Sequence, residues 1–251
     1  MNFGRLFRII SRLFQFLGVV FGAMADYWIR LAFRTKKSGL LARELWLQRH
    51  SRRMLKMFQL KPQVSGAIPT RGLLISNHLS YLDIVVISSV TPAVFVAKKE
   101  VRSWPALGLC AQMGGTLFVD RQRRMQVGEM NDEIQKALDA GALVVLFPEG
   151  TSSNGQGVLP FRSALLEPAA QHVHSLHVGC LQYSLDEGDA GNEVCYWGDH
   201  SFFSHMLNLM GHRTLRASVR FAPFDSDVTD RKELARQLRE EVLKLKGEVI
   251  V

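Results

Sequence analysis

The stretch Gly72–Ile84, with the sequence GLLISNHLSYLDI, decides the fold of this chain. It opens on the short apolar run Gly72–Ser76, which predicts a buried strand, and it leads into Tyr81–Ser89, where the pattern predicts a helix. Short apolar runs and helical stretches continue to alternate toward the C-terminus. That alternation is typical of an α/β domain.

Further apolar runs and periodic stretches complete the predicted elements. Strands are expected at Ala93–Ala97, Thr116–Val119, Leu143–Phe147, Ser175–Tyr183, Val194–Trp197 and Thr214–Ala222, and helices at Gln126–Ala140 and Thr229–Lys246. Thr214–Ala222 alternates apolar residues with Arg216, Ser218 and Arg220, so one face of this strand is expected to be polar. The last helix carries an apolar stripe at helical spacing, which predicts core packing. We therefore expect an α/β fold with a mixed central sheet flanked by helices.

The net charge of +8 over 251 residues is concentrated at one end of the chain. Residues 1–62 hold 13 basic and two acidic side chains, whereas residues 63–251 hold 18 basic and 21 acidic ones. The first segment also contains 10 of the 23 aromatic residues. We therefore divide the chain into a basic, aromatic-rich helical segment (1–62) and an α/β domain (63–251). Basic and aromatic side chains together indicate either nucleic acid or an anionic membrane surface as a partner.

Within the basic segment, Leu13–Ala25 carries no charge but is shorter than the roughly 20 apolar residues of a membrane-spanning helix. Aromatic and basic residues follow it, and Leu40–Phe58 forms a second helical stretch. This pattern predicts a helical hairpin that associates with anionic lipid. The alternative is a hairpin that packs on its own domain with a solvated basic face. Three cysteines make no disulfide framework and fit a reducing compartment.

The most informative polar residues are His78 and Asp83, which follow the strand Gly72–Ser76. Side chains five residues apart on a continuous helix point about 140° apart. Contact therefore requires His78 to lie in the turn and Asp83 in the first helical turn. The imidazole would then bond to the carboxylate through one nitrogen and accept a proton through the other. Ser80-x-x-Asp83 is also a capping box, so Asp83 can serve as a helix cap as well.

A second polar turn, Phe147–Gly155 (FPEGTSSNG), follows the strand at Leu143. Free backbone N–H groups after Gly150 and the hydroxyl of Thr151 suit an anion, whereas Glu149 suits a hydroxyl or an amine. The alternative is a tight turn with a local cap. Arg121, after the strand at Thr116, and Arg162 supply planar cations that match phosphate geometry. A surface ion pair is the alternative for Arg121.

Taken together in this order and spacing, these stretches resemble the glycerolipid acyltransferase family, and more closely bacterial 1-acylglycerol-3-phosphate O-acyltransferases. The resemblance runs from about Arg71 to Phe224. Asn77-His78-x4-Asp83 is similar to the family block that holds the catalytic pair. Gly115–Arg121 and Phe147–Ser152 resemble the blocks that bind the glycerol-phosphate part.

The resemblance implies an O-acyltransferase with His78 as general base and Asp83 as its partner. Substrate-binding residues are then expected to be Phe118, Arg121, Glu149, Gly150, Thr151 and Arg162. The donor is expected to be acyl-CoA or acyl carrier protein, with no cofactor and no metal. The acceptor is expected to be a lysophospholipid, first 1-acylglycerol-3-phosphate, in phospholipid biosynthesis. The protein is expected at the bacterial cytoplasmic (inner) membrane, with its catalytic domain on the cytoplasmic side.

Departures from the family pattern leave the acceptor open. Phe161–Ala164 lacks the glycine that members often carry, and His174–Cys180 lacks a proline. Tyr196–Asp199 (YWGD) resembles members that act on other lysophospholipids or on lyso-ornithine lipid, so such an acceptor is the alternative.

Competing classes of protein explain less of the sequence. A serine hydrolase of the α/β-hydrolase type needs Gly-x-Ser-x-Gly, which this sequence lacks. His172-x-His174-x-x-His177 resembles metal-ligand spacing, but polar histidines leading into a strand are the simpler interpretation. A non-catalytic membrane-binding module would account for residues 1–62 and leave the His78 turn unexplained. No recognition motif supports nucleic acid.

Overall fold

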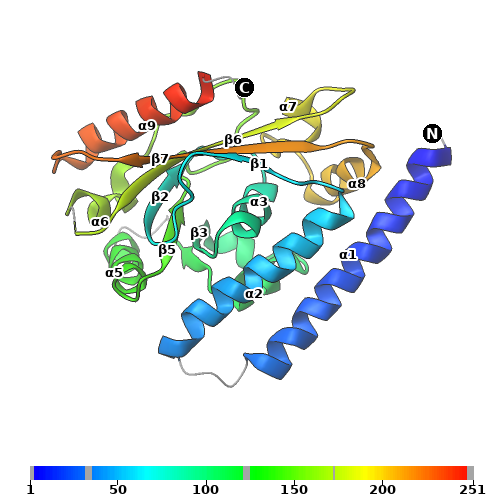
Figure 1. Ribbon diagram of the computed structural model, residues 1–251, viewed down its shortest axis with the longest axis horizontal. Helices are drawn as coiled ribbons and strands as arrows, with labels where there is room; N and C mark the ends of the chain where they lie inside the picture. The colour runs from blue at the N-terminus through cyan, green and yellow to red at the C-terminus, as the bar shows by residue number, and fades with distance from the viewer. Residues whose placement is uncertain (1–2, 32–35, 121–124, 172, 248–251) are drawn as a thin grey trace.

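The computed structural model describes residues 3–31, 36–120, 125–171 and 173–247. Its centre is a seven-stranded sheet with the order β1-β7-β6-β2-β5-β3-β4 (Figure 1). The strands are β1 (Gln63–Ser65), β2 (Gly72–Ser76), β3 (Val94–Lys98), β4 (Leu117–Val119), β5 (Leu143–Leu146), β6 (Leu176–Ser184) and β7 (Arg216–Phe224). Neighbouring strands run parallel except for β6 and β7, which run antiparallel. The predicted mixed sheet is confirmed.

Helices cover both faces of this sheet. They are α1 (Phe3–Arg30), α2 (Lys36–Met57), α3 (Leu82–Val90), α4 (Leu107–Met113), α5 (Met125–Asp139), α6 (Glu167–Ala170), α7 (Ala190–Glu193), α8 (Phe202–Gly211) and α9 (Arg231–Gly247), with 3-10 turns at Lys99–Ser103 and Ser163–Leu165. Side chains alternate across β2, so that Leu74 packs in the core beneath α1, α2, α3 and α8. Leu73 and Ile75 pack in the core beneath α5, α6 and α9. Both faces of the central strands are therefore buried, which explains why they are continuously apolar.

The two N-terminal helices form an antiparallel pair along one side of the molecule (Figure 1). Phe16 and Val20 of α1 join the same apolar core as Leu55 of α2. The buried Trp46 of α2 donates from Nε1 to the carbonyl of Ala23, at 3.1 Å. The hairpin therefore packs on the body of the protein, while the division at residue 62 stays a prediction.

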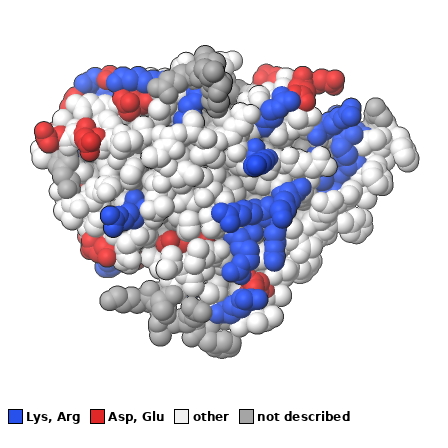
Figure 2. All heavy atoms as spheres, in the orientation of Figure 1, with Lys and Arg blue, Asp and Glu red and all other residues white. Residues whose placement is uncertain are grey.

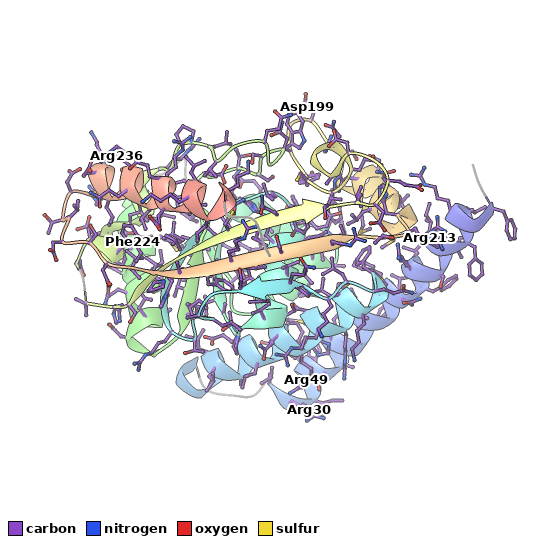
Figure 3. The ribbon with its side chains drawn as sticks, turned by 45° about the horizontal axis from the view of Figure 1, so that its top comes forward. Arg30, Arg49, Asp199, Arg213, Phe224 and Arg236 are labelled. Atoms are coloured by element: carbon purple, nitrogen blue, oxygen red, sulfur yellow. The ribbon has the colours of Figure 1, made fainter. Side chains whose placement is uncertain are left out.

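Ion pairs near the end of α1 also join the two helices. Asp26 lies 2.7 Å from Arg30 and 3.0 Å from Arg49. These two arginines lie together at the edge of the helix pair (Figure 3). Because both are about half exposed or more, the pairs contribute little to stability beyond orienting Asp26.

One expectation about local structure is wrong, and the structure adds to two others. Val194–Trp197 is not a strand, because it follows α7 as a turn region and its Tyr196 N–H makes a single bond to the carbonyl of Leu79, at 2.8 Å. Arg220 in β7 is buried, because α9 covers the polar face of that strand. The last carbonyls of α9 accept hydrogen bonds from the Arg220 guanidinium. The uncharged segment Leu13–Ala25 is only part of α1, whose 28 residues include basic side chains that bond to the body.

Candidate active site

The predicted histidine lies at the carboxyl edge of the sheet, where β2 and β5 end side by side. Ile75 of β2 pairs with Leu146 of β5, so the turns that follow the two strands begin side by side. His78 lies in the first turn and Glu149 in the second. This is the edge at which α/β sheets place their ligands.

His78 and Asp83 are in direct contact. Nδ1 of His78 donates to Oδ2 of Asp83 at 2.7 Å, because His78 lies in the turn and Asp83 in the first turn of α3. The same Oδ2 accepts from the backbone N–H groups of Leu79, at 2.7 Å, and Ser80, at 3.0 Å. The carboxylate therefore closes the turn before α3 and holds the imidazole at the same time, so the two predicted roles coexist. The bond at Nδ1 leaves Nε2 to exchange a proton with a ligand.

Glu149 supports this turn from the neighbouring strand. Its Oε1 accepts from the backbone N–H of His78 at 2.7 Å, and its Oε2 accepts from that of Leu159 at 3.0 Å. Burial raises the pKa of this carboxyl, while the two backbone bonds oppose that effect. Both oxygens bond to the protein's own backbone, so the side chain fixes the position of His78. A role in binding substrate stays a prediction.

A pocket of about 1000 Å³ opens beside His78. The imidazole stacks on Phe147 with ring centroids 4.4 Å apart and lines this pocket together with Lys98, Trp104, Tyr196 and Trp197. The side chain of His78 is 22% exposed, whereas Asp83 is fully buried. A ligand in the pocket therefore reaches the imidazole and not the carboxylate.

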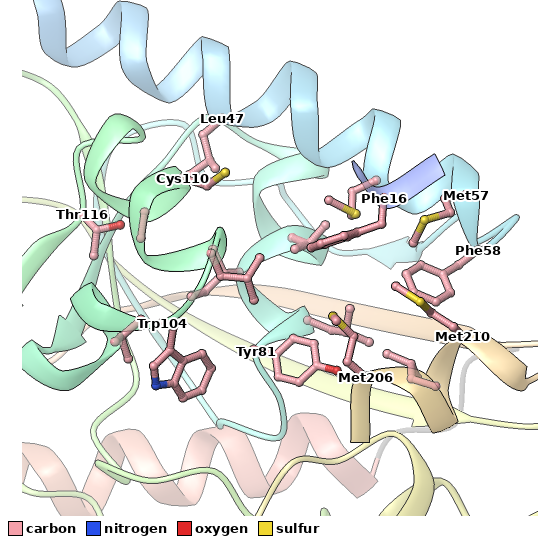
Figure 4. Close-up of a pocket in the computed structure, with 18 residues that line it drawn as sticks. Phe16, Leu47, Met57, Phe58, Tyr81, Trp104, Cys110, Thr116, Met206 and Met210 are labelled. Atoms are coloured by element: carbon pink, nitrogen blue, oxygen red, sulfur yellow. The ribbon is translucent and has the colours of Figure 1, made fainter. Parts of the chain in front are cut away.

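A second pocket, of about 810 Å³, adjoins the first and is apolar (Figure 4). The two pockets share the side chains Tyr81, Ile84, Val101 and Trp104. Figure 4 shows Phe16, Met57 and Met210 on one side of the apolar pocket and Leu47, Cys110 and Thr116 on the other. Because its walls are hydrocarbon and sulfur atoms with few polar groups, this space suits an alkyl chain.

The remaining predicted binding residues lie at different distances from the histidine. Gly150 and Thr151 line the His78 pocket, and Gly150 adopts a φ of 74°, in the left-handed region that favours glycine. Arg162 is exposed and lines a neighbouring pocket that shares Phe147 and Gly150 with the first. Phe118 lies half-buried in β4, opposite Ala97 of β3. Arg121 lies outside the described residues.

The structure also places residues at the site that no local sequence signal singles out. Tyr183, at the end of β6, donates from its hydroxyl to Oδ1 of Asp83 at 2.8 Å. Tyr81 donates to Nδ1 of His205 at 3.1 Å, because Nε2 of that histidine donates to the carbonyl of Cys195. Burial lowers the pKa of His205 to about 4, so this imidazole is neutral near pH 7. Tyr81 is thereby fixed between the two pockets.

The sequence of this chain is similar to those of known acyltransferases. The family model described as Acyltransferase matches residues 61–184. A lyso-ornithine lipid O-acyltransferase of Rhizobium meliloti (strain 1021) is 33% identical over 217 residues, which cover 80% of this chain and 74% of that protein. The chain belongs to the acyltransferase family.

Two other known acyltransferases are similar to this chain, one in sequence and one in fold. A 1-acyl-sn-glycerol-3-phosphate acyltransferase of Neisseria gonorrhoeae is 36% identical over 138 residues, covering 51% of this chain and 54% of that protein. The crystal structure of the 1-acyl-sn-glycerophosphate (LPA) acyltransferase of Thermotoga maritima has the same fold, with a TM-score of 0.69 and 18% identity over 96% of this chain and 94% of that one. The protein is therefore an acyltransferase of lipid metabolism, as its motifs indicate.

Proposed function

We propose that this acyltransferase moves an acyl group from a thioester, acyl-CoA or acyl carrier protein, to the free hydroxyl of a lysolipid, with His78 as general base. The contact between Asp83 and His78, whose imidazole lines the pocket, is the observation that carries the proposal. A thioester is already activated, so the reaction needs no serine or cysteine nucleophile.

In the proposed reaction, Nε2 of His78 removes the proton from the lipid hydroxyl as its oxygen attacks the thioester carbon. The C–O bond forms, the C–S bond breaks, and the thiolate that leaves takes the proton back from Nε2. The carboxylate of Asp83 keeps the imidazole in the tautomer with a proton on Nδ1 and stabilises the imidazolium. The backbone N–H of His78 donates to the carboxylate of Glu149 and its carbonyl accepts from the N–H of Ser153. These bonds hold His78 in place, which reduces the cost of positioning.

The apolar pocket supports a lipid-derived substrate. Its shared wall with the His78 pocket would place an alkyl chain next to the imidazole. Filling that pocket would remove hydrocarbon from water and stabilise binding by about 0.8 kcal/mol for each buried methylene.

For the acceptor we propose lyso-ornithine lipid first. The relative that acts on it aligns with 80% of this chain, which is more than the stretch that holds the shared motifs. Lysophosphatidate, the first expectation from sequence, is the second candidate and is supported by the relative that matches 51% of the chain. An ornithine headgroup carries a carboxylate and lysophosphatidate a phosphate, so either acceptor would suit a cation such as Arg162 at the neighbouring pocket.

The exposed surface of α1 supports association with a bilayer. Among the described residues, α1 is a helix that is long and apolar enough to cross a membrane, with a mean hydropathy of 1.5 over 18 residues. Large apolar side chains lie exposed along it at Phe3, Phe7, Ile10, Phe14, Leu17, Phe21 and Trp28. Exposed basic residues gather over the adjacent α2, at Arg49, Arg52, Arg53 and Lys56 (Figure 2). An apolar face beside a basic one is the pattern of a helix that binds an anionic surface.

We propose that α1 lies on the membrane, because its opposite face is bonded to the body. Arg12 is buried and donates to the carbonyls of Met57, at 3.2 Å, and Met210, at 3.0 Å. Arg8 donates to the carbonyl of Gly211 at 3.1 Å. These arginines cap the end of α8, where free carbonyls attract cations. A spanning orientation would break these bonds. Since both thioester donors are made in the cytoplasm, we place the site on the cytoplasmic side of the bacterial inner membrane.

A donor and acceptor panel tests the proposed function. Purified protein is given acyl-CoA or acyl carrier protein with lyso-ornithine lipid, lysophosphatidate or other lysophospholipids, and products are identified by mass spectrometry. We expect acylation of lyso-ornithine lipid at the highest kcat/KM. Faster acylation of lysophosphatidate would reverse the order of acceptors, and no acylation of any lysolipid would refute the proposed function.

A further inference from the structure

Tyr183 touches the Asp83 carboxylate from the side opposite His78. Its hydroxyl donates to Oδ1 at 2.8 Å, while Oδ2 accepts from His78, Leu79 and Ser80. Oδ1 has no other hydrogen bond among the described residues, and the carboxylate is fully buried. A buried carboxylate oxygen without a donor is costly, so Tyr183 satisfies an atom that would otherwise be unpaired.

The side chain of Asn77 brings Tyr183 to this position. Strand β2 pairs with β6 up to Ser76 and Gly179. Beyond that point Nδ2 of Asn77 donates to the carbonyl of Leu181 at 3.0 Å, and Oδ1 of Asn77 accepts from the N–H of Leu181 at 2.8 Å. The amide thus replaces one rung of the ladder and keeps β6 beside the His78 turn for two more residues. Tyr183 reaches Asp83 as a result.

We propose that Tyr183 is a positioning residue of the reaction, whose hydroxyl fixes the Asp83 carboxylate so that Oδ2 stays aligned with Nδ1 of His78. This inference rests on the proposed role of His78 as general base. Without the hydroxyl, Oδ1 would seek another donor, and rotation of the carboxylate toward one would weaken its bond to the imidazole.

A polar pocket of about 620 Å³ lies behind this contact and makes such a rotation possible. Tyr183 lines it together with Asn154, Gln182, Asp189 and Asn192. Water in this space would offer donors to an Asp83 oxygen that had lost its phenol. The tyrosine therefore both supplies the bond and stands between the carboxylate and the polar pocket.

The surroundings keep the phenol in its donating form. Burial raises the pKa of Tyr183 well above its ordinary value, and the charge of Asp83 acts in the same direction. Among the described residues, the other titratable groups that face this pair are His78 in the turn after β2, Tyr81 at the start of α3, Cys195 after α7 and Glu149 after β5. A phenol that stays protonated can only donate to a carboxylate.

The test compares Tyr183→Phe with Tyr27→Phe, the same change in α1, where the ring packs on Trp46 away from the site. For Tyr183→Phe we expect kcat to fall about tenfold or more, because a hydrogen bond to a charged group is strong enough for its loss to change a rate by that factor. KM should change little, because Tyr183 does not line the His78 pocket. The acid limb of the kcat/KM profile should move to lower pH, because a carboxylate that has turned away from Nδ1 stabilises the imidazolium less. Tyr27→Phe should leave kcat, KM and the profile unchanged.

A proton resonance provides a readout that does not depend on turnover. The proton between Nδ1 of His78 and Asp83 should resonate at low field, be absent from His78→Ala, and shift or broaden in Tyr183→Phe but not in Tyr27→Phe. An unmoved resonance and an unchanged pH profile in Tyr183→Phe would overturn the inference. Full activity of His78→Ala would overturn the proposed function instead, whatever the resonance shows.

Discussion

Replacing Asp83 with asparagine isolates the contribution of a single charge to the site. The carboxylate accepts four hydrogen bonds, three of them at Oδ2. An amide oxygen at the Oδ2 position would keep those three, and the amide nitrogen at the Oδ1 position would donate to Tyr183 once its hydroxyl turned to accept. The turn before α3 should therefore keep its shape while the negative charge is lost.

The expected loss follows from the distance between the two groups. Nδ1 and Oδ2 are 2.7 Å apart, so the centres of charge of the imidazolium and the carboxylate are about 4 Å apart. At that distance and an effective dielectric constant of about 20, their attraction is about 4 kcal/mol. Each 1.36 kcal/mol changes a rate about tenfold, so kcat should fall roughly a thousandfold.

The assay measures release of free thiol from acyl-CoA in the presence of the acceptor, with melting temperature followed in parallel. KM should change little, because Asp83 is fully buried and does not line the pocket beside His78. A fall in kcat of less than about tenfold, in a variant that melts near the wild-type temperature, would refute the reasoning.

Further predictions concern stability, membrane binding and chain length. Burial raises the pKa of Glu44 to about 7, so the stability of the wild type should fall as pH rises from the ordinary pKa of a glutamate to about 7. Glu44→Gln should therefore raise the melting temperature at pH 8, where it removes a cost of about 3 kcal/mol, but not at pH 4. An equal effect at both pH values would contradict this. Phe14 is 72% exposed on α1 and Val173 is 66% exposed elsewhere, so Phe14→Glu should reduce sedimentation with anionic liposomes and Val173→Glu should not; equal losses would argue against the α1 face. Cys110 lines the apolar pocket, so Cys110→Trp should lower activity with palmitoyl donors more than with octanoyl donors, and a uniform loss would argue against a chain in that pocket.

Much of the fold is readable from the sequence because its signals are local. The apolar strands before His78 and Glu149 are buried on both faces, and each ends at a short polar turn. The carboxyl ends of adjacent parallel strands meet at one edge of a sheet. The pairing of His78 with Asp83 also follows from local geometry, since a strand, a turn and a first helical turn bring residues five apart into contact.

Contacts across the sheet could not be predicted in the same way. Tyr183 lies 100 residues beyond Asp83 in the chain, and its position depends on the order of strands and on the side chain of Asn77. The prediction of a strand at Val194–Trp197 was wrong because Val194 and Cys195 bond to the carbonyl of Ala190 in α7, and Tyr196 bonds to that of Leu79 in the turn after β2. Burial of Arg220 depends on the end of α9, which lies over β7 only in the folded chain.

The measurement that tests the central claim most directly is acyl transfer by purified His78→Ala, compared with Val173→Glu as a control outside the site. The loss of Nε2 removes the proposed base, so product formation by His78→Ala should fall to the rate without enzyme, while its melting temperature and liposome binding stay close to those of the wild type. Acyl transfer by folded His78→Ala at the wild-type rate would contradict the account.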